Sequence, residues 1–159
     1  MGVAAACGGG GQVEPDTPPV VVPLTRVVAT FPVAARPFGI DVSSKGIAYI
    51  TQLDASTVTT ADASAPKLTG VLGVGSTPTA VAFNGTGTVA YVANQASGTI
   101  SVVNVATGTQ AAVIPVSGNP LNVAVSLDGS AVYASTNDGR VSRIDPATRT
   151  VTASVLVGT

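Results

Sequence analysis

The sequence predicts an all-β fold: a partial β-propeller of three four-stranded antiparallel blades plus one extra outer strand. Two observations predict it. The first is an internal repeat, in which a proline, a glycine and a tyrosine each recur at intervals of 41 or 42 residues: Pro37, Pro78 and Pro120; Gly46, Gly87 and Gly129; Tyr49, Tyr91 and Tyr133. The second is that each interval holds four short runs of alternating apolar residues separated by turn residues, with no helical period. A period of about 40–45 residues with four strands per copy is typical of propeller blades.

The extra strand is expected over residues 25–33, where the chain alternates like the fourth strand of the later repeats. The first three strands of such a repeat do not precede it, and Pro32 favours an edge position. The first blade, about residues 36–75, follows. Its strands are expected over 39–43, 47–51, 58–62 and 68–74.

The second blade, about residues 77–118, is the clearest copy. Its strands are expected over 80–83, 89–93, 99–104 and 111–116. The third blade covers about residues 119–159. Its strands are expected over 122–126, 131–135, 140–145 and 150–158. Asp128-Gly129 and Asp138-Gly139 predict tight turns within it, because glycine adopts positive φ without steric cost.

Composition excludes several classes of function. Only 9% of the residues are charged, the net charge is −1 and the pI is near 5.0, so no basic surface for nucleic acid is expected. A single cysteine rules out a disulfide within the chain. The absence of histidine removes the commonest general base and the commonest metal ligand. With 45% hydrophobic residues the chain should still form a globular core.

Residues 1–24 have no core-forming pattern and form a separate N-terminal region. Within it, Ala4-Ala5-Ala6-Cys7-Gly8 resembles a bacterial lipoprotein processing site, in which small residues precede a cysteine that becomes lipidated. The six residues before Cys7 do not hold the basic and apolar parts of a full signal. The alternative is therefore a flexible arm with an incidental thiol. The proline-rich segment 12–23 would act as an extended spacer.

The second strands of the repeats carry a family resemblance. Tyr49-Ile50-Thr51-Gln52, Tyr91-Val92-Ala93-Asn94 and Tyr133-Ala134-Ser135-Thr136 resemble the motif that names the YVTN family of β-propeller repeats, as do the runs over 98–109 and 139–148. The resemblance covers about residues 27–159. It implies a secreted or surface-attached bacterial or archaeal propeller, and says little about chemistry.

The candidate site follows from the propeller topology. The loops that join fourth to first strands and second to third strands share one face, where propellers usually bind ligands. The ligand-binding candidates are the polar residues of these loops: Arg36, Gln52, Asp54, Asn94, Gln95, Asn119, Asn137, Asp138 and Arg140. Such groups bond neutral partners or sugars, but they do not pair a nucleophile with a base. For several of them, a hairpin or surface ion-pair role is the simpler interpretation.

These observations predict a non-catalytic binding or surface-scaffold module of a bacterial cell envelope, secreted or lipid-anchored through Cys7. The ligand would be a small molecule, a protein or a glycan, and we expect no cofactor, no metal and no catalytic residue. One alternative stays open. The sequence could be a fragment of a lactonase- or dehydrogenase-like propeller enzyme with its catalytic residues in missing blades.

The blade count raises a further question, because closed propellers usually have 4–8 blades. Either the sequence is a piece of a longer propeller, or a short chain completes a ring by self-association through its open blade edges. In both cases the third blade should expose an apolar flank and favour aggregation. The residues expected on the strands of this flank are Val123, Val125, Val132 and Leu156.

Overall fold

The structure is a computed structural model that describes residues 30, 32–33, 36–65 and 67–158. The described residues form twelve strands in three separate four-stranded antiparallel sheets, and this part of the chain contains no helix. The fold is a partial β-propeller of three blades, as the sequence predicts. Residues 1–24, including Cys7, lie outside the described residues.

Each blade consists of four strands that are consecutive in the chain and hydrogen-bonded in sequence order. The first blade contains β1 (Pro37–Val42), β2 (Ile47–Gln52), β3 (Thr57–Asp62) and β4 (Lys67–Gly73). The second contains β5 (Pro78–Phe83), β6 (Val89–Asn94), β7 (Thr99–Asn104) and β8 (Thr109–Pro115). The third contains β9 (Pro120–Val125), β10 (Val132–Thr136), β11 (Arg140–Asp145) and β12 (Thr150–Leu156). Every strand overlaps the range expected for it, and each first strand begins two residues early, at its proline.

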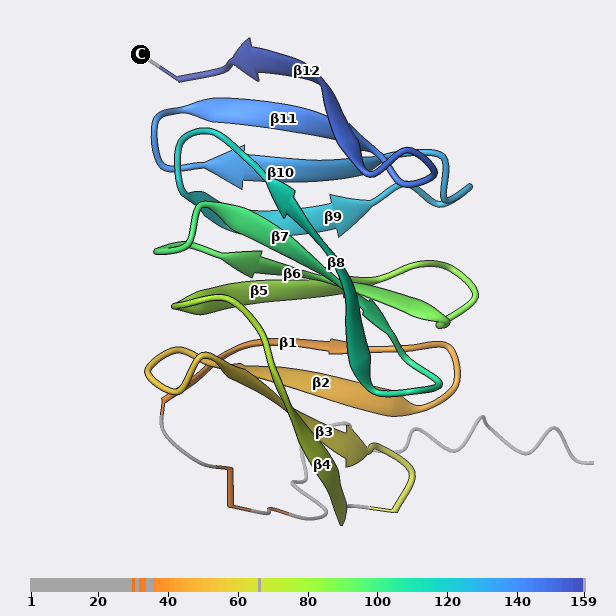
Figure 1. Ribbon diagram of the computed structural model, residues 1–159. Helices are drawn as coiled ribbons and strands as arrows, with labels where there is room; N and C mark the ends of the chain where they lie inside the picture. Colours follow the sequence, from red (N-terminus) through yellow and green to blue (C-terminus); the bar gives the residue numbers. More distant parts are fainter. Residues whose placement is uncertain (1–29, 31, 34–35, 66, 159) are drawn as a thin grey trace, which may run out of the picture.

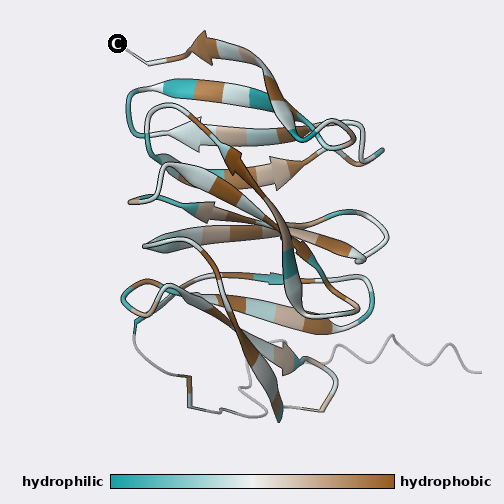
Figure 2. Ribbon diagram, in the orientation of Figure 1, coloured by the Kyte–Doolittle hydropathy of each residue, from teal (hydrophilic) through white to brown (hydrophobic). Residues whose placement is uncertain are grey.

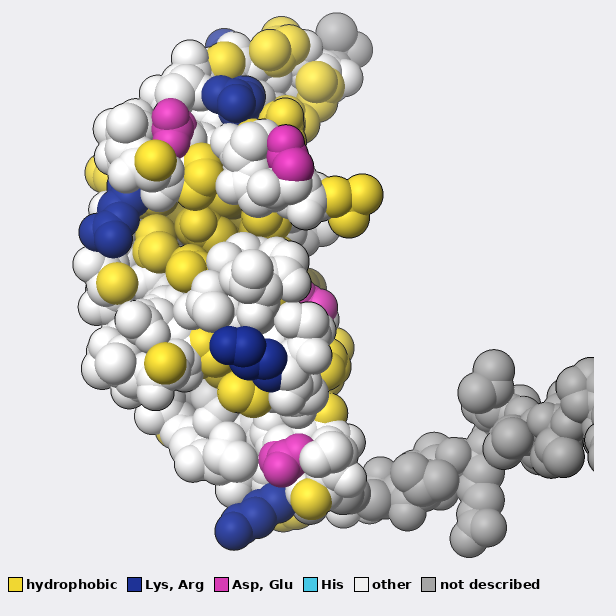
Figure 3. All heavy atoms as spheres, turned by 90° about the vertical axis from the view of Figure 1, so that its right-hand side faces the viewer, with side chains coloured by type: hydrophobic (Ala, Val, Ile, Leu, Met, Phe, Trp, Pro, Cys, Tyr) yellow, Lys and Arg dark blue, Asp and Glu magenta, His cyan; other side chains and the backbone are white. Residues whose placement is uncertain are grey.

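The three blades are stacked face to face in chain order (Figure 1). The first strands β1, β5 and β9 contact one another along the stack. In the space-filling view of Figure 3 the stack is crescent-shaped. Hydrophobic residues concentrate on the strands and hydrophilic ones at the turns (Figure 2). The molecule is therefore an arc of blades with loops at two ends.

Local sequence explains the turns at one of these ends. The turns between first and second strands contain Gly46, Gly87 and Gly129, all at positive φ (75°, 62° and 71°). The turns between third and fourth strands begin with an Asp or Asn whose Oδ1 accepts two backbone N–H bonds, which fixes a tight Asx-turn. These residues are Asp62, Asn104 and Asp145. We call this end the turn end.

The cores lie between neighbouring blades, because each sheet buries its faces against the next. Tyr49 packs from the first blade against the second, where it meets the ring of Phe83 edge-on at a centroid distance of 4.9 Å. Tyr91 packs in the same way from the second blade against the third. The repeat tyrosine thus marks each junction.

The outer face of the third blade, at one end of the stack, is open. Tyr133, the repeat tyrosine of the third blade, is 40% exposed, and Val155 on the same sheet is 61% exposed. The prediction of an exposed apolar flank on the third blade is wrong for Val123 and Val132, which are buried in the core with the second blade, and for Val125, which packs on that core. They lie on the opposite face from Tyr133, because side chains alternate along a strand.

The extra strand expected over 25–33 lies mostly outside the described residues. Thr30, Pro32 and Val33 are described and are not in a strand. Val33 packs against the first blade, on the core cluster of Ala48, Ile50 and Ala61. Val74 and Val116, which also stand four residues before a blade's proline, pack on the junction cores in the same manner. Val33 therefore repeats the contact that an outer strand makes with the following blade.

Candidate ligand-binding rim

The loops opposite the turn end are joined in pairs by a hydrogen bond that recurs in every blade. The residue before each first-strand proline accepts a backbone N–H from the loop between the second and third strands. The bonds run from Leu53 N to Arg36 O (3.1 Å), from Gln95 N to Thr77 O (2.9 Å) and from Asn137 N to Asn119 O (3.1 Å). We call the surface made by these paired loops the rim.

Backbone strain accompanies each of these bonds. Arg36, Thr77 and Asn119 have φ values of 39°, 54° and 53°. Residues with a side chain rarely adopt positive φ, and such conformations cost about 1–3 kcal/mol each. The strain recurs where the carbonyl must turn toward the neighbouring loop. The rim is therefore a set of held loops whose backbone is fixed at the same point in every blade.

In the first blade the rim carries an ion pair. Arg36 Nη1 donates to Asp54 Oδ1 at 3.1 Å, and the side chains are 67% and 50% exposed. The structure thus brings together two of the sequence-predicted site residues from different loops. An exposed pair of this kind contributes about 1 kcal/mol or less, so its main effect is to cancel charge on the rim.

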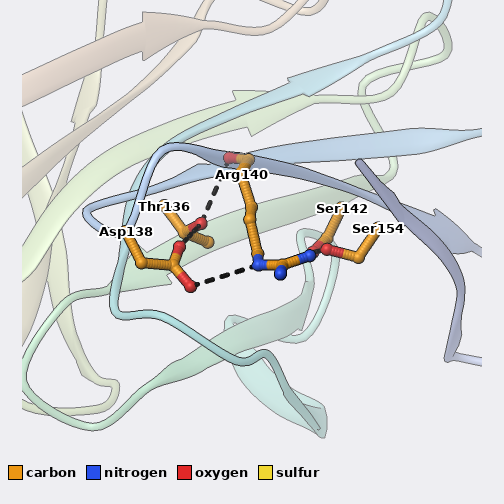
Figure 4. Close-up of polar contacts among 5 residues, drawn as sticks. All are labelled: Thr136, Asp138, Arg140, Ser142 and Ser154. Atoms are coloured by element: carbon orange, nitrogen blue, oxygen red, sulfur yellow. Dashed lines mark hydrogen bonds and ion pairs between the residues drawn. The ribbon is translucent and has the colours of Figure 1, made fainter. Parts of the chain in front are cut away.

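The third blade carries a second charged group, drawn in Figure 4. Thr136 Oγ1 lies 2.5 Å from Asp138 Oδ1 and 3.1 Å from the carbonyl oxygen of Arg140. Arg140 Nε lies 3.5 Å from Asp138 Oδ2. Asn119 and Asn137 are exposed beside this loop. The arginine pairs within its own hairpin, so this part of the rim is also close to neutral.

The second blade contributes an uncharged stretch of rim. Ser97 Oγ accepts a hydrogen bond from Ser76 N at 2.7 Å, which joins the two loops a second time. Gln95 is half-buried next to them. Hydroxyl and amide groups are thus the polar groups available here.

Two of the predicted site residues are buried and hold the blade together. Gln52 and Asn94, each at the end of a second strand, are 0% exposed. Gln52 Nε2 donates to Thr59 Oγ1 at 3.1 Å, and Asn94 Nδ2 donates to Ser101 Oγ at 2.9 Å. These bonds favour a structural role over ligand contact. The sequence analysis did not predict these hydroxyl partners, Thr59 and Ser101, which lie on the third strands of their blades. They are 42 residues apart, which is the period of the repeat and could have indicated them.

The loop entering the second blade runs close to Asn94. A Cβ built on Gly75 would lie 2.7 Å from Asn94 Cγ, so this position requires glycine. Asn94 Oδ1 is the buried side-chain oxygen that has no hydrogen-bond partner among the described residues. Gly118 at the next junction, with φ of 85°, is equally restricted, because a Cβ there would collide with the carboxylate of Asp138.

A hollow lies beside the rim on the first strands of the three blades. Its volume is about 240 Å³, and its lining includes Phe38 and Ile40 from β1, Val81 from β5, and Leu121 and Asn122 from β9. Phe38 and Ile40 are each 66% exposed. The hollow offers a ligand both apolar side chains and polar groups, the latter including Thr79 and Asn122.

The first strand β1 also forms a hydrogen bond to the second blade that the sequence analysis did not predict. Asp41 Oδ2 accepts a hydrogen bond from Phe83 N at 2.9 Å, which links β1 to β5 across the first junction. An aspartate inside the otherwise apolar segment 37–42 is the signal that could have indicated it.

The chemistry of the rim is that of neutral hydrogen bonding. Among the described residues no group of three or more His, Cys, Asp or Glu side chains could hold a metal ion. The hydrogen bonds of the rim join hydroxyls, amides and paired ions. In the same part of the chain, no helix is long and apolar enough to cross a bilayer.

Comparisons with known proteins support the fold. No family model and no curated protein matches the sequence. A solved structure titled Kuenenia stuttgartiensis hydrazine synthase matches 77% of this chain with a TM-score of 0.74 and 27% identity. A functionally unknown protein from Desulfotomaculum acetoxidans DSM 771 matches 80% with a TM-score of 0.69 and 25% identity. This chain spans 36% and 44% of those two chains, so it resembles less than half of each.

Proposed function

We propose that this chain is a non-catalytic binding or surface-scaffold propeller module of a bacterial cell envelope, with its ligand face on the rim. The observation that carries the proposal is the recurring loop-to-loop bond, which holds the polar loops of all three blades beside one hollow on the first strands. Fixed loops lose little conformational entropy when a ligand binds. A rigid frame of this kind suits recognition.

The charge of the rim supports a neutral ligand. Its two arginines, Arg36 and Arg140, are each paired with an aspartate, so neither presents an unopposed charge. The remaining exposed side chains include the amides Asn119, Asn122 and Asn137. Amides both donate and accept hydrogen bonds, as sugar hydroxyls do. We therefore propose a glycan of the cell envelope as the ligand.

The test is cosedimentation of the full chain with purified peptidoglycan sacculi. We expect the wild-type chain to sediment with the sacculi, and the triple variant Arg36→Ala, Asn122→Ala, Asn137→Ala to lose most of this binding. All three side chains are exposed, so the fold should persist, which circular dichroism would verify.

The matched control carries Thr86→Ala, Thr107→Ala and Ser130→Ala, which remove exposed hydroxyls at the turn end. It should bind like the wild type. Absence of wild-type binding, or equal loss in both triple variants, would count against the rim as the ligand face.

The cell-envelope assignment is proposed from the small-residue run before Cys7 and from the resemblance of the repeats to the YVTN family. Both point to an extracytoplasmic propeller, tethered by a lipid in the first case. Expression in a bacterium with labelled palmitate, with a complete lipoprotein signal placed before Ala4, tests whether Cys7 is lipidated. Incorporation that Cys7→Ser abolishes is expected, and label-free protein in the soluble fraction would refute lipidation.

A further inference from the structure

A second cavity lies at the turn end, in the junction between the first and second blades. Its volume is about 320 Å³, near the lower end of the usual range for small-molecule sites, about 300–1,000 Å³. The first blade supplies most of its wall, and the second supplies Val105 and Gly108. Figure 3 views this end of the molecule, where Lys or Arg and Asp or Glu side chains are scattered without a large area of one charge.

The internal repeat explains why this junction is hollow. Gly108 and Arg149 occupy the same position in successive blades, because each donates its backbone N–H to the residue that opens the turn, Asn104 or Asp145. Their φ values are 64° and 59°. At the second junction this position carries the Arg149 side chain, whereas at the first junction it carries only a hydrogen atom. The cavity wall at the first junction therefore lacks a side chain that the chain carries at the same position of the neighbouring copy.

The charge of Arg149 acts on the repeat tyrosine of the second junction. Tyr49 lines the cavity at the first junction, and Tyr91 is its counterpart at the second. Burial raises the pKa of Tyr91, and the positive charge of Arg149 acts in the opposite direction. The arginine thus lies near the tyrosine that corresponds to Tyr49.

The wall of the first junction is also more polar than that of the second. Strand pairing places Thr60 opposite Gly70, and Val102 opposite Ala112, so Thr60 corresponds to Val102. Thr60 and Thr69 join their hydroxyls at 2.9 Å on this wall. The wall also holds Asp62, where the second blade has Asn104. The first junction therefore carries hydroxyl and carboxylate groups that the corresponding positions of the second blade do not have.

The charges at the cavity disfavour a cationic ligand. Lys45 and Asp62 both line it and offset each other. Hydrogen bonds from Ser64 hold the pKa of Asp62 below its ordinary value, and Lys67 also acts on this carboxylate. A ligand cation would be repelled by Lys45 and Lys67, whose two positive charges exceed the single negative charge of Asp62. An uncharged ligand with several donors and acceptors, and one apolar face for Tyr49 and Val105, fits better.

We propose that this cavity binds one unit of a neutral polyhydroxylated ligand, such as a single sugar residue. Asp62 and the threonine hydroxyls would accept and donate hydrogen bonds to its hydroxyl groups, and Lys45 would donate. The site is at the opposite end of the blades from the rim, so the two proposals can fail independently.

The test is a titration of the full chain, labelled with ¹⁵N, with methyl α-D-glucoside and with N-acetylglucosamine. Single-sugar affinities should fall in the millimolar range. We expect amide shifts that saturate around Gly108 and the turn that follows Asp62. Agmatine serves as a cationic probe and should cause no saturating shift there.

The decisive variant is Gly108→Arg, which places at the first junction the side chain of the second. It should abolish the shifts, while Gly108→Ala, which imposes the same backbone strain but adds one methyl group in open space, should preserve them. Thr60→Val and Thr69→Ala reproduce residues of the second blade and should weaken binding roughly fivefold through lost hydrogen bonds. No saturating shift with either sugar, equal binding by Gly108→Arg, or preference for agmatine would overturn the proposal.

Discussion

Replacing the repeat tyrosine in two different blades tests whether the junctions stabilise this chain. Tyr91 is 5% exposed and lies in the core between the second and third blades, whereas Tyr133, at the same repeat position, is 40% exposed. Removing a buried aromatic ring costs about 3–5 kcal/mol, because apolar burial is lost and a cavity remains. Tyr133→Ala removes a ring that still contacts water, so we expect a loss of about 1 kcal/mol or less.

The assay is urea unfolding of the full chain, followed by far-UV circular dichroism. Tyr91→Ala should lower the free energy of unfolding by at least about 2 kcal/mol more than Tyr133→Ala, with an unchanged dependence on urea. If Tyr91→Ala does not fold, Tyr91→Leu supplies a milder variant that retains part of the apolar volume. Equal losses from Tyr91→Ala and Tyr133→Ala would refute the reasoning, because the repeat position rather than burial would then determine stability.

Three further predictions concern the loops and the buried polar groups. Ser101→Ala removes the buried hydroxyl that Asn94 donates to, and should lower the free energy of unfolding by about 1–3 kcal/mol in the same assay. Gly118→Ala should destabilise the chain through its positive φ and its collision with Asp138, whereas a thermal midpoint equal to that of the wild type would contradict this. Hydrogen bonds from Ser126 and Ser130 lower the pKa of Asp128 from 3.8 to about 2, so folding favours its ionised form. This stabilisation is present above about pH 4 and is lost as the pH falls through 2. In the variant Asp128→Asn, the free energy of unfolding should therefore fall less steeply between about pH 4 and pH 2 than in the wild type.

Much of the fold could be predicted from local patterns. Alternating apolar residues located the strands, and the glycines of the turn end located the reversals, because both depend only on neighbours in the chain. The starts of the first strands were placed two residues late. Pro37 and its counterparts join their strands at the first position, where the missing N–H of proline costs no ladder bond.

The candidate site was less predictable. Loop topology correctly grouped Arg36 with Asp54, since the two loops that carry them meet on the rim. It also grouped Gln52 and Asn94 with them, although both side chains turn inward and are buried. A residue at a strand end can face either the core or the solvent, and the polar partners that decide this lie seven residues further along.

The sequence by itself determined that each blade has four strands, the order of these strands and the position of every blade's proline, turn glycine and tyrosine. These features follow from short-range rules of backbone conformation and side-chain alternation. Only the tertiary structure decided that Tyr49 is buried while Tyr133 is 40% exposed, and that Gly108 lines a cavity at the first junction. The physical reason is that burial in a stack of blades belongs to the junction between two copies, and identical residues acquire different environments according to the neighbour they meet.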